Sequence, residues 1–423
     1  MMPAPACPPP RRTMMTSATA TSRSTPTAAA RLDSLTGLRW IAALMIFCLH
    51  IQSESNFFIA DSRAQDALNS LLAAGRSGVS FFFILSGFVL AWSVRPTDTA
   101  SRFWWRRFSK IYPNHFATFL VACLLLSWRG MEVIDFERMF YNLTLLHSWP
   151  PGQSDVWYSF NGPSWSLSCE AFFYLCFPLL YAGLRRLRPA AWWVISVASV
   201  LFIAVLPFGI KLFHEPFGWS EHFIVYHLPP VRMVEFLLGM CLALLVRGGW
   251  WRGPGMTVSI VVILAGMAAA AFLPEEYGLA RDAACTVLGY SLLLPACALA
   301  DVRRSRSIWR ARRLVYLGEV SFAFYMVHEI CLYAVRHTFG DDHPHRPSVA
   351  AGVLVLATFC FALVAAMVLH HVVELPMMRL LTGGRRRPVA GGVPPAGSGA
   401  VLVGPGGERA AAAAPEPVAA GRT

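Results

Sequence analysis

The chain has 423 residues, of which 56% are hydrophobic and only 14% are charged, and its formal net charge is +12. Soluble domains average about 25% charged residues, so this composition excludes an ordinary soluble protein. Most of the chain is expected to face lipid or its own interior. The positive charge does not indicate a nucleic-acid partner, because the basic residues lie in loops that alternate with apolar segments.

Ten apolar segments are long enough to cross a bilayer as helices. They lie near residues 35–52, 75–94, 111–128, 164–184, 190–210, 228–246, 255–273, 282–300, 314–335 and 348–370. Backbone polar groups inside hydrocarbon must bond one another. The sequence therefore predicts an all-α, multi-pass protein of the cell membrane with about ten transmembrane helices.

The basic residues between these segments predict the orientation of the chain. If the N-terminus is cytoplasmic, most of them fall on the inner side, including the clusters at 303–313 and 385–387. This asymmetry follows the positive-inside rule and places both termini in the cytoplasm. We expect a disordered leader over 1–30, the membrane domain over 31–380 and a disordered Gly/Ala/Pro-rich tail over 381–423.

Arg39 and His50 lie eleven residues apart in the first apolar segment. Eleven residues make three helical turns, so both side chains share one face and are separated by about 16 Å. An arginine in hydrocarbon costs from roughly 3 kcal/mol upward and usually faces a bundle interior or a water-filled cavity. A histidine is well suited to proton transfer near neutral pH. The pair predicts an active site within the membrane; alternatively, Arg39 snorkels to the headgroups and His50 lies in the outer interface.

A basic stretch precedes the third segment. Arg102, Arg106 and Lys110 share a helical face, and Arg107 lies beside them. Pro113 suits the start of a helix, so we expect the stretch to lie along the inner membrane surface before the chain enters the bilayer. It is either a membrane anchor of the positive-inside kind or a clamp for the phosphates of a nucleotide-bearing donor.

Glu170 lies within the fourth apolar segment, with Tyr174 one turn after it and Ser166 one turn before it. An ionisable group inside a membrane span is a functional-site hypothesis by default. The alternative is a structural hydrogen bond to a neighbouring helix.

Two later segments also carry polar groups. Arg232 and Glu235 are three residues apart in the sixth segment and could neutralise each other locally. Ser321, Tyr325 and His328 share one face of the ninth segment.

The sequence predicts no metal site. His370, His371 and Glu374 follow the tenth segment without a further ligand group nearby. The ten cysteines include no CxxC pair, and nearly all of them lie inside the predicted spans, so we interpret them as small buried residues.

Six sequence blocks in this order resemble the acyltransferase 3 family of integral membrane O-acyltransferases over roughly residues 31–380. The blocks are Leu35-Thr36-Gly37-Leu38-Arg39-Trp40 running to His50, Phe81-Phe82-Phe83-Ile84-Leu85-Ser86-Gly87, Arg106-Arg107-Phe108-Ser109-Lys110-Ile111-Tyr112-Pro113, Trp165-Ser166-Leu167-Ser168-Cys169-Glu170, Arg232-x-x-x-Phe236-x-x-Gly239, and Leu317-Gly318-x-x-Ser321-Phe322-x-x-Tyr325-x-x-His328.

The resemblance implies ten transmembrane helices and transfer of an acyl group, commonly acetyl from a coenzyme A thioester, to a hydroxyl. The family's arginine-x10-histidine motif corresponds to Arg39 and His50, and its basic motif corresponds to Arg106 and Arg107. The implied acceptors range from cell-envelope polysaccharides to macrolide-type secondary metabolites.

The chain departs from the family pattern at two positions. Lys110 stands where the family often has arginine, and Phe322 stands where tyrosine is common. Neither change removes an expected catalytic group. The C-terminal esterase-like domain of some members is not expected here.

From these observations we expect His50 to act as general base for an acceptor hydroxyl or as a transient acyl carrier. Arg39 is too far along the helix to stabilise the same oxyanion, so we expect it to bind the donor. Arg106 and Arg107 are expected on the donor's phosphates, and Glu170 is expected to orient groups in the core.

Five further residues are expected to contact substrate: Lys110, Arg232, Ser321, Tyr325 and His328. His328 is also the alternative base. The expected partners are an acyl-CoA donor, most simply acetyl-CoA, and a hydroxyl-bearing glycan or secondary-metabolite acceptor, with no tightly bound cofactor. A transporter that uses the same charges as a proton relay is the alternative function. A purely structural or sensory membrane protein would leave the buried Arg, His and Glu unexplained.

Overall fold

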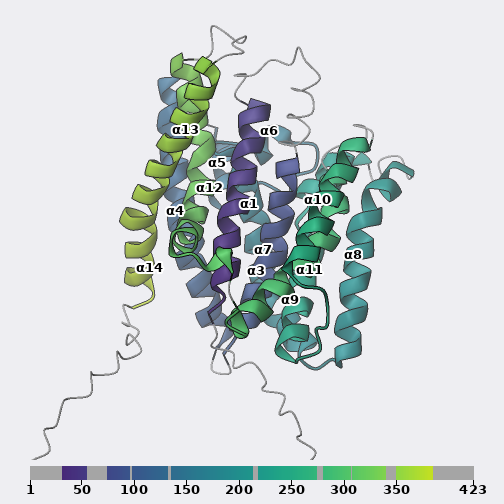
Figure 1. Ribbon diagram of the computed structural model, residues 1–423. Helices are drawn as coiled ribbons and strands as arrows, with labels where there is room; N and C mark the ends of the chain where they lie inside the picture. The colour runs from purple at the N-terminus through teal and green to yellow at the C-terminus, as the bar shows by residue number, and fades with distance from the viewer. Residues whose placement is uncertain are drawn as a thin grey trace, which may run out of the picture. The chain divides into compact units, whose positions relative to one another are not determined.

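The computed structural model describes residues 31–54, 74–95, 98–131, 135–212, 218–273, 280–305, 307–339 and 349–383, and every regular element within these ranges is helical (Figure 1). The predicted all-α class is confirmed. The leader predicted over 1–30, and all but the first residues of the predicted tail, lie outside the described residues.

Ten long helices coincide with the ten predicted segments. They are α1 (Asp33–Glu54), α3 (Ser77–Ser93), α4 (Ala100–Trp128), α7 (Trp165–Leu184), α8 (Pro189–Leu212), α9 (Pro229–Arg247), α10 (Met256–Phe272), α11 (Ala280–Val302), α12 (Arg312–Phe339) and α13 (Val349–Val368). The shorter elements are η1 (Ala74–Arg76), α5 (Phe136–Leu143), α6 (Ser154–Trp157), η2 (Gly162–Ser164), the π-helical turn η4 (Phe223–His227), η6 (Ile308–Arg310), the π-helical turn η7 (Leu369–Glu374) and α14 (Leu375–Leu381).

The lengths of these helices suit a bilayer. Within the described ranges, eight helices are long and apolar enough to cross a membrane, and α3 and α10 are apolar helices of 17 residues each. About 20 residues span a typical hydrocarbon core, and η1 leads directly into α3. The protein is therefore a multi-pass membrane protein, as its composition predicted.

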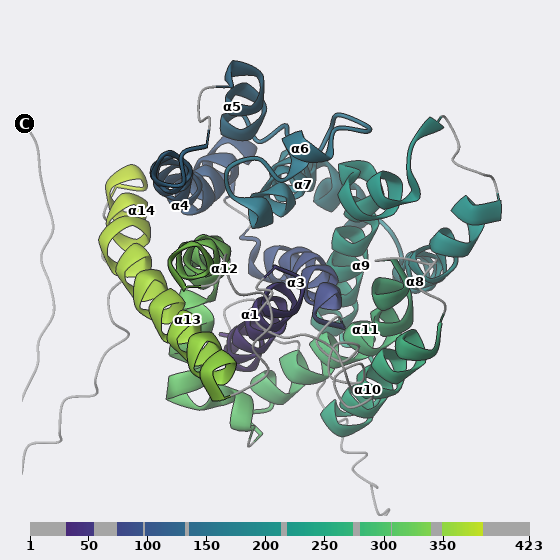
Figure 2. The ribbon, with the colours of Figure 1, turned by 90° about the horizontal axis from the view of Figure 1, so that it is seen from above.

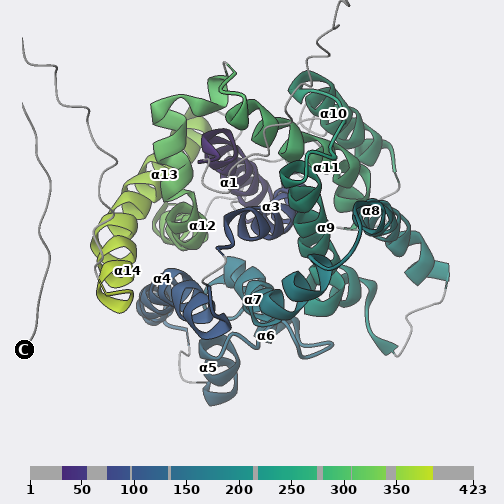
Figure 3. The ribbon, with the colours of Figure 1, turned by 90° about the horizontal axis from the view of Figure 1, so that it is seen from below.

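Helices α1 and α3 form the centre of the bundle. Seen along the bundle from either end, they are surrounded by α4, α7, α9, α11 and α12, with α13 on one side and α8 and α10 on the other (Figures 2 and 3). Burial separates these helices in part, because the spans of α9, α11 and α12 are each 72% buried, those of α4 and α7 are 33% and 39% buried, and that of α8 is 28% buried. The inner helices can hold polar groups, and the outer ones are left to face lipid.

Glycines allow α3 and α9 to pack backbone against backbone. A Cβ atom on Gly87 of α3 would overlap the carbonyl oxygen of Phe236, and one on Gly239 of α9 would overlap the carbonyl oxygen of Ile84. Small residues at helix contacts permit this close approach, which supplies van der Waals packing where lipid gives no hydrophobic drive. The crossing fixes the position of α3, and α3 carries part of the site described below.

Gly239→Val should therefore prevent correct assembly of the bundle. The added side chain cannot move away from a backbone oxygen, so we expect a cost of at least about 1–3 kcal/mol. The yield of monodisperse protein in detergent and its unfolding temperature would measure the loss. Gly352→Val on α13 is the matched control, because no atom lies within 4 Å of a Cβ built there. Equal yields and unfolding temperatures for the two variants would contradict the packing argument.

The structure corrects one prediction about the third span. The basic stretch is not a separate surface segment, because α4 runs unbroken from Ala100 to Trp128 with Pro113 inside it. The Thr99 side chain accepts a hydrogen bond from the backbone N–H of Arg102 at 3.3 Å and begins the helix there. A proline within a span is tolerated where neighbouring helices enclose it, and Pro113 is buried. Of the basic side chains, Arg107 and Lys110 are therefore carried into the bundle on α4, and Arg102 stays exposed.

Candidate active site

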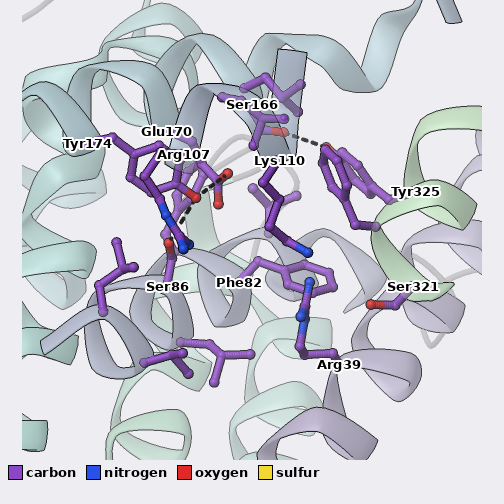
Figure 4. A pocket seen from close by; sticks show the side chains of 18 residues that line it. Arg39, Phe82, Ser86, Arg107, Lys110, Ser166, Glu170, Tyr174, Ser321 and Tyr325 are labelled. Carbon is purple, nitrogen blue, oxygen red and sulfur yellow. Dashed lines mark hydrogen bonds between the residues drawn. The ribbon is translucent and has the colours of Figure 1, made fainter. Parts of the chain in front are cut away.

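A cavity of about 130 Å³ lies among α1, α3, α4, α7 and α12 (Figure 4). We call it the cationic cavity. Its polar lining consists of Arg39, Ser86, Arg107, Lys110, Ser166, Glu170, Tyr174, Ser321 and Tyr325. Six of these residues were predicted from the sequence as site residues: Arg39, Arg107, Lys110, Glu170, Ser321 and Tyr325. Five helices from across the chain thus contribute to one site.

Positive charge dominates the cationic cavity. Arg39, Arg107 and Lys110 face a single acidic residue, Glu170, among the described lining residues. Arg39 and Lys110 extend toward each other from α1 and α4 (Figure 4). Charges in a low-dielectric interior interact strongly, so this cavity favours an anionic or strongly polarised ligand.

Glu170 is held by its own helix. The hydroxyl of Tyr174, one turn later on α7, donates a hydrogen bond to Glu170 Oε2 at 2.8 Å. The same hydroxyl lies 3.4 Å from Ser86 Oγ of α3. Arg107 lies beside this group (Figure 4). The carboxylate is therefore fixed in direction, which suits a group that orients others.

A buried carboxylate on η7 positions Lys110. Lys110 Nζ lies 3.1 Å from Glu374 Oε1, and Asn114 Nδ2 donates to Glu374 Oε2 at 3.0 Å. His370 Nδ1 lies 3.1 Å from the same Oε2. Both oxygens of Glu374 are satisfied, which is what a buried carboxylate requires. Sequence reasoning considered Glu374 only as a metal ligand and missed Asn114, because this contact joins residues about 260 positions apart and no local pattern signals it.

His50 and His328 form a pair between α1 and α12. His50 Nδ1 and His328 Nε2 are 2.9 Å apart, and the His328 ring is almost fully buried. The ring centroid of Tyr325, which lines the cationic cavity, lies 5.8 Å from that of His328. The two histidines therefore adjoin the cationic cavity beside Tyr325. The contact between them was not predicted from the sequence.

Hydrogen bonds to the backbone determine which nitrogens of the pair carry protons when both rings are neutral. His328 Nδ1 lies 2.7 Å from the carbonyl oxygen of Tyr325 and 3.2 Å from that of Phe324. A carbonyl only accepts, so His328 Nδ1 carries the proton and His328 Nε2 accepts from His50 Nδ1–H. His50 Nε2 then carries a lone pair, and none of the described residues donates a hydrogen bond to it. That is the nitrogen a general base needs.

Two predicted site residues lie away from the cationic cavity. Arg106 points to Asp98, with 2.9 Å between Nη1 and Oδ1. Partial burial raises the pKa of Asp98, but the hydrogen bond and charge of Arg106 lower it by more, so the net shift is downward. Arg232 is buried and forms the predicted pair with Glu235 at 3.1 Å, and its Nη2 also donates to Ser80 Oγ at 3.2 Å. Arg232 therefore ties α9 to α3.

The structure thus has a charged cavity inside a bundle of membrane-spanning helices. The comparison with protein families shows which class of membrane protein this is. The family model described as an acyltransferase domain matches residues 32–371. The chain belongs to the acyltransferase 3 family, as its six sequence blocks indicated. It is an integral membrane acyltransferase.

Curated relatives agree with this assignment. Acyltransferase MdmB from Streptomyces mycarofaciens is 40% identical over 379 residues, which cover 86% of this chain and 96% of that protein. The exopolysaccharide production protein ExoZ from Rhizobium meliloti (strain 1021) is 24% identical over 327 residues, covering 75% of this chain and 93% of ExoZ. Nodulation protein 10 from Rhizobium leguminosarum bv. viciae is 30% identical over 156 residues, covering 33% and 42%. No solved structure matches the chain significantly.

Proposed function

We propose that this acyltransferase moves a short acyl group, acetyl in the simplest case, from acyl-CoA to a hydroxyl of a carbohydrate or a secondary metabolite. The observation that carries the proposal is the position of the His50–His328 pair next to a cationic cavity inside the bundle. The alternative is a transporter that uses the same charges as a proton relay. Membership of the acyltransferase family favours the enzyme.

The charges of the cationic cavity support an acyl-CoA donor. Arg107 and Lys110 lie in the first half of α4, near the membrane face that the arginine distribution predicts to be cytoplasmic. Guanidinium groups bind phosphate through paired hydrogen bonds, and a lysine ammonium adds a point charge. The cavity holds about 130 Å³, which suits the thioester end of the donor, with the phosphates nearer the membrane surface.

The tautomer of His50 supports direct transfer. His50 Nε2 takes the proton of the acceptor hydroxyl while the hydroxyl oxygen attacks the thioester carbonyl carbon. A C–O bond forms, the C–S bond breaks, and the leaving thiolate of coenzyme A receives the proton from His50. Alternatively, the same nitrogen attacks the thioester first and forms an acyl-histidine that the hydroxyl then resolves. Both routes use the same free lone pair.

The name of one relative supports a saccharide among the acceptor classes. ExoZ is named for exopolysaccharide production, and the nodulation protein shares a shorter region with this chain. Acyltransferase MdmB, which aligns with most of the chain, is named only for acyl transfer. The proposal therefore includes both glycans and glycosylated secondary metabolites.

Arg107→Ala tests the donor site. We expect the purified wild-type protein in detergent to bind labelled acetyl-CoA and to transfer its acetyl group to hydroxyl-bearing extracts. Loss of a charge-assisted hydrogen bond costs about 1.5–3 kcal/mol, so Arg107→Ala should weaken acetyl-CoA binding roughly 10- to 150-fold. A binding titration with the labelled donor measures it.

Arg106→Ala is the matched comparison for this experiment. It removes the same charge one position earlier on α4, but its side chain faces Asp98 outside the cavity lining. We expect a much smaller loss of donor affinity. Unchanged affinity in both variants would reduce the basic stretch to a membrane anchor, and failure of the wild-type protein to bind acetyl-CoA would overturn the proposed donor.

A further inference from the structure

A second, larger cavity of about 370 Å³ lies in the same bundle, and we call it the polar cavity. The second half of α4, the α5–α6 region and the second half of α12 form its walls. Acyl transfer needs two substrates, and the cationic cavity accommodates only the charged donor. The polar cavity is therefore a second binding space that the donor does not explain.

The two cavities follow one another along the same two helices. On α12, Tyr325 lines the cationic cavity, and Glu329, Tyr333 and Arg336 line the polar cavity. These residues are spaced by four, four and three positions, so they form one helical stripe. Helices α4 and α12 both begin beside the cationic cavity and end beside the polar cavity. The polar cavity is thus displaced toward the opposite face of the membrane.

The turn η2 separates the cavities at the level of the histidine pair. The hydroxyl of Tyr325 donates to the carbonyl oxygen of Pro163 at 2.9 Å and lies 2.8 Å from Ser166 Oγ. His328, which contacts His50, is the residue before Glu329 on α12. Along α12, the histidine pair therefore lies at the level between Tyr325 of the cationic cavity and Glu329 of the polar cavity.

Asn161 lines the polar cavity and has a buried polar atom without a hydrogen-bond partner among the described residues. Asn161 is 2% exposed, and its Nδ2 donates to the carbonyl oxygen of Met326 at 2.9 Å. That bond identifies the other amide atom as Oδ1, which has no hydrogen-bond partner among the described residues. Buried acceptors are seldom left unmatched, so the Oδ1 atom of this cavity-lining residue calls for a hydrogen-bond donor from water or from a ligand. A hydroxyl group is such a donor.

The charges of the polar cavity balance. Its lining contains three basic and three acidic residues: Arg129, Arg138, Arg336, Asp135, Asp155 and Glu329. Arg138 pairs with Asp135 at 3.0 Å and with Asp155 at 2.7 Å. Without a net charge the cavity does not favour a phosphate, and its many donors and acceptors beside tyrosine rings suit a ligand rich in hydroxyl groups.

We propose that the polar cavity binds the acceptor through a sugar unit, with Asn161 Oδ1 accepting a hydrogen bond from a ring hydroxyl and Glu329 accepting another. The inference rests on the proposed function, because it assigns the second substrate of that reaction. Donor and acceptor then approach the His50–His328 pair from opposite ends of the bundle. A polysaccharide and a glycosylated secondary metabolite share this chemistry.

Binding titrations on the full-length protein in detergent test the inference, with erythromycin as a glycosylated secondary metabolite and maltose as an oligosaccharide. We expect wild-type protein to bind at least one of them at millimolar or lower concentration. Asn161→Ala and Glu329→Gln should each weaken that binding about tenfold, the effect of one lost hydrogen bond to a buried group. Acetyl-CoA binding should not change.

Glu319→Gln is the control, because Glu319 lies on the same helix, outside both cavity linings, and pairs with Arg31 at 2.8 Å. Sugar binding by Glu319→Gln should equal that of the wild-type protein. If neither sugar binds, or if all three variants bind it equally, the polar cavity is not the acceptor site. A wild-type protein that binds acetyl-CoA but no sugar overturns only this inference, whereas one that binds no acetyl-CoA overturns the proposed donor reaction.

Discussion

His50→Ala should insert and fold normally yet lose acyl transfer by about 10²- to 10⁴-fold, which is the usual contribution of a general base. The expectation follows from the hydrogen bonds of the pair. His328 Nε2 accepts from His50 Nδ1–H, which leaves His50 Nε2 free to take a proton. Turnover of labelled acetyl-CoA with an acceptor extract measures the loss, and donor affinity should remain close to that of the wild-type protein.

His50→Gln separates the base from the hydrogen bond. Glutamine keeps a polar side chain of similar reach but cannot take a proton, so it should be as inactive as alanine. Loss of one buried hydrogen bond costs about 1–3 kcal/mol of stability, which a thermal unfolding measurement would detect separately. A His50→Ala protein with near-native turnover, together with an inactive His328→Ala protein, would move the base to α12 and refute the mechanism proposed here.

The membrane fold could be predicted from the sequence because the signals that set it are local. Each span is a continuous apolar run, and a helix satisfies its own backbone within that run. All ten predicted segments became helices. The one error, at Pro113, came from giving a proline more weight than the Thr99 cap, although the surrounding helices enclose the proline.

The site could be predicted only as a set of residues. A polar group inside an apolar segment is energetically costly and so indicates a site, which is how Arg39 and Glu170 were predicted. Lys110 was predicted from the basic stretch before the third segment. The sequence does not show which neighbouring helix a given side chain faces. It therefore could not distinguish Arg107, which lines the cationic cavity, from Arg106, which faces Asp98.

Whether a contact could be predicted from the sequence depended on how far apart its two residues lie along the chain. The pair of Arg232 and Glu235 spans three residues of one helix and was predicted. The contact between His50 and His328 spans 278 residues and was not. The role of His328 changes accordingly, from a residue predicted to bind substrate to one that contacts the expected base.

His328→Ala should lower kcat by about 10- to 100-fold, the scale on which partners that orient a catalytic or ligating histidine usually act. Without His328 Nε2, His50 Nδ1 loses its acceptor on α12 and the ring keeps its backbone hydrogen bond with Ile46, so the ring is held less firmly in its orientation and tautomer. The KM for acetyl-CoA should hardly change, because His328 is absent from the lining of the cationic cavity. Steady-state kinetics at varied donor concentration would separate kcat from KM.

His328→Gln is the variant that distinguishes the two roles, because the glutamine amide oxygen can accept a hydrogen bond from His50 Nδ1–H and alanine cannot. A positioning role predicts that glutamine restores a large part of kcat, even though glutamine has no titratable group. A role as the base itself predicts that glutamine is as inactive as alanine. If His328→Gln shows no recovery while folding and donor binding are intact, the positioning role is wrong and His328 itself takes part in proton transfer.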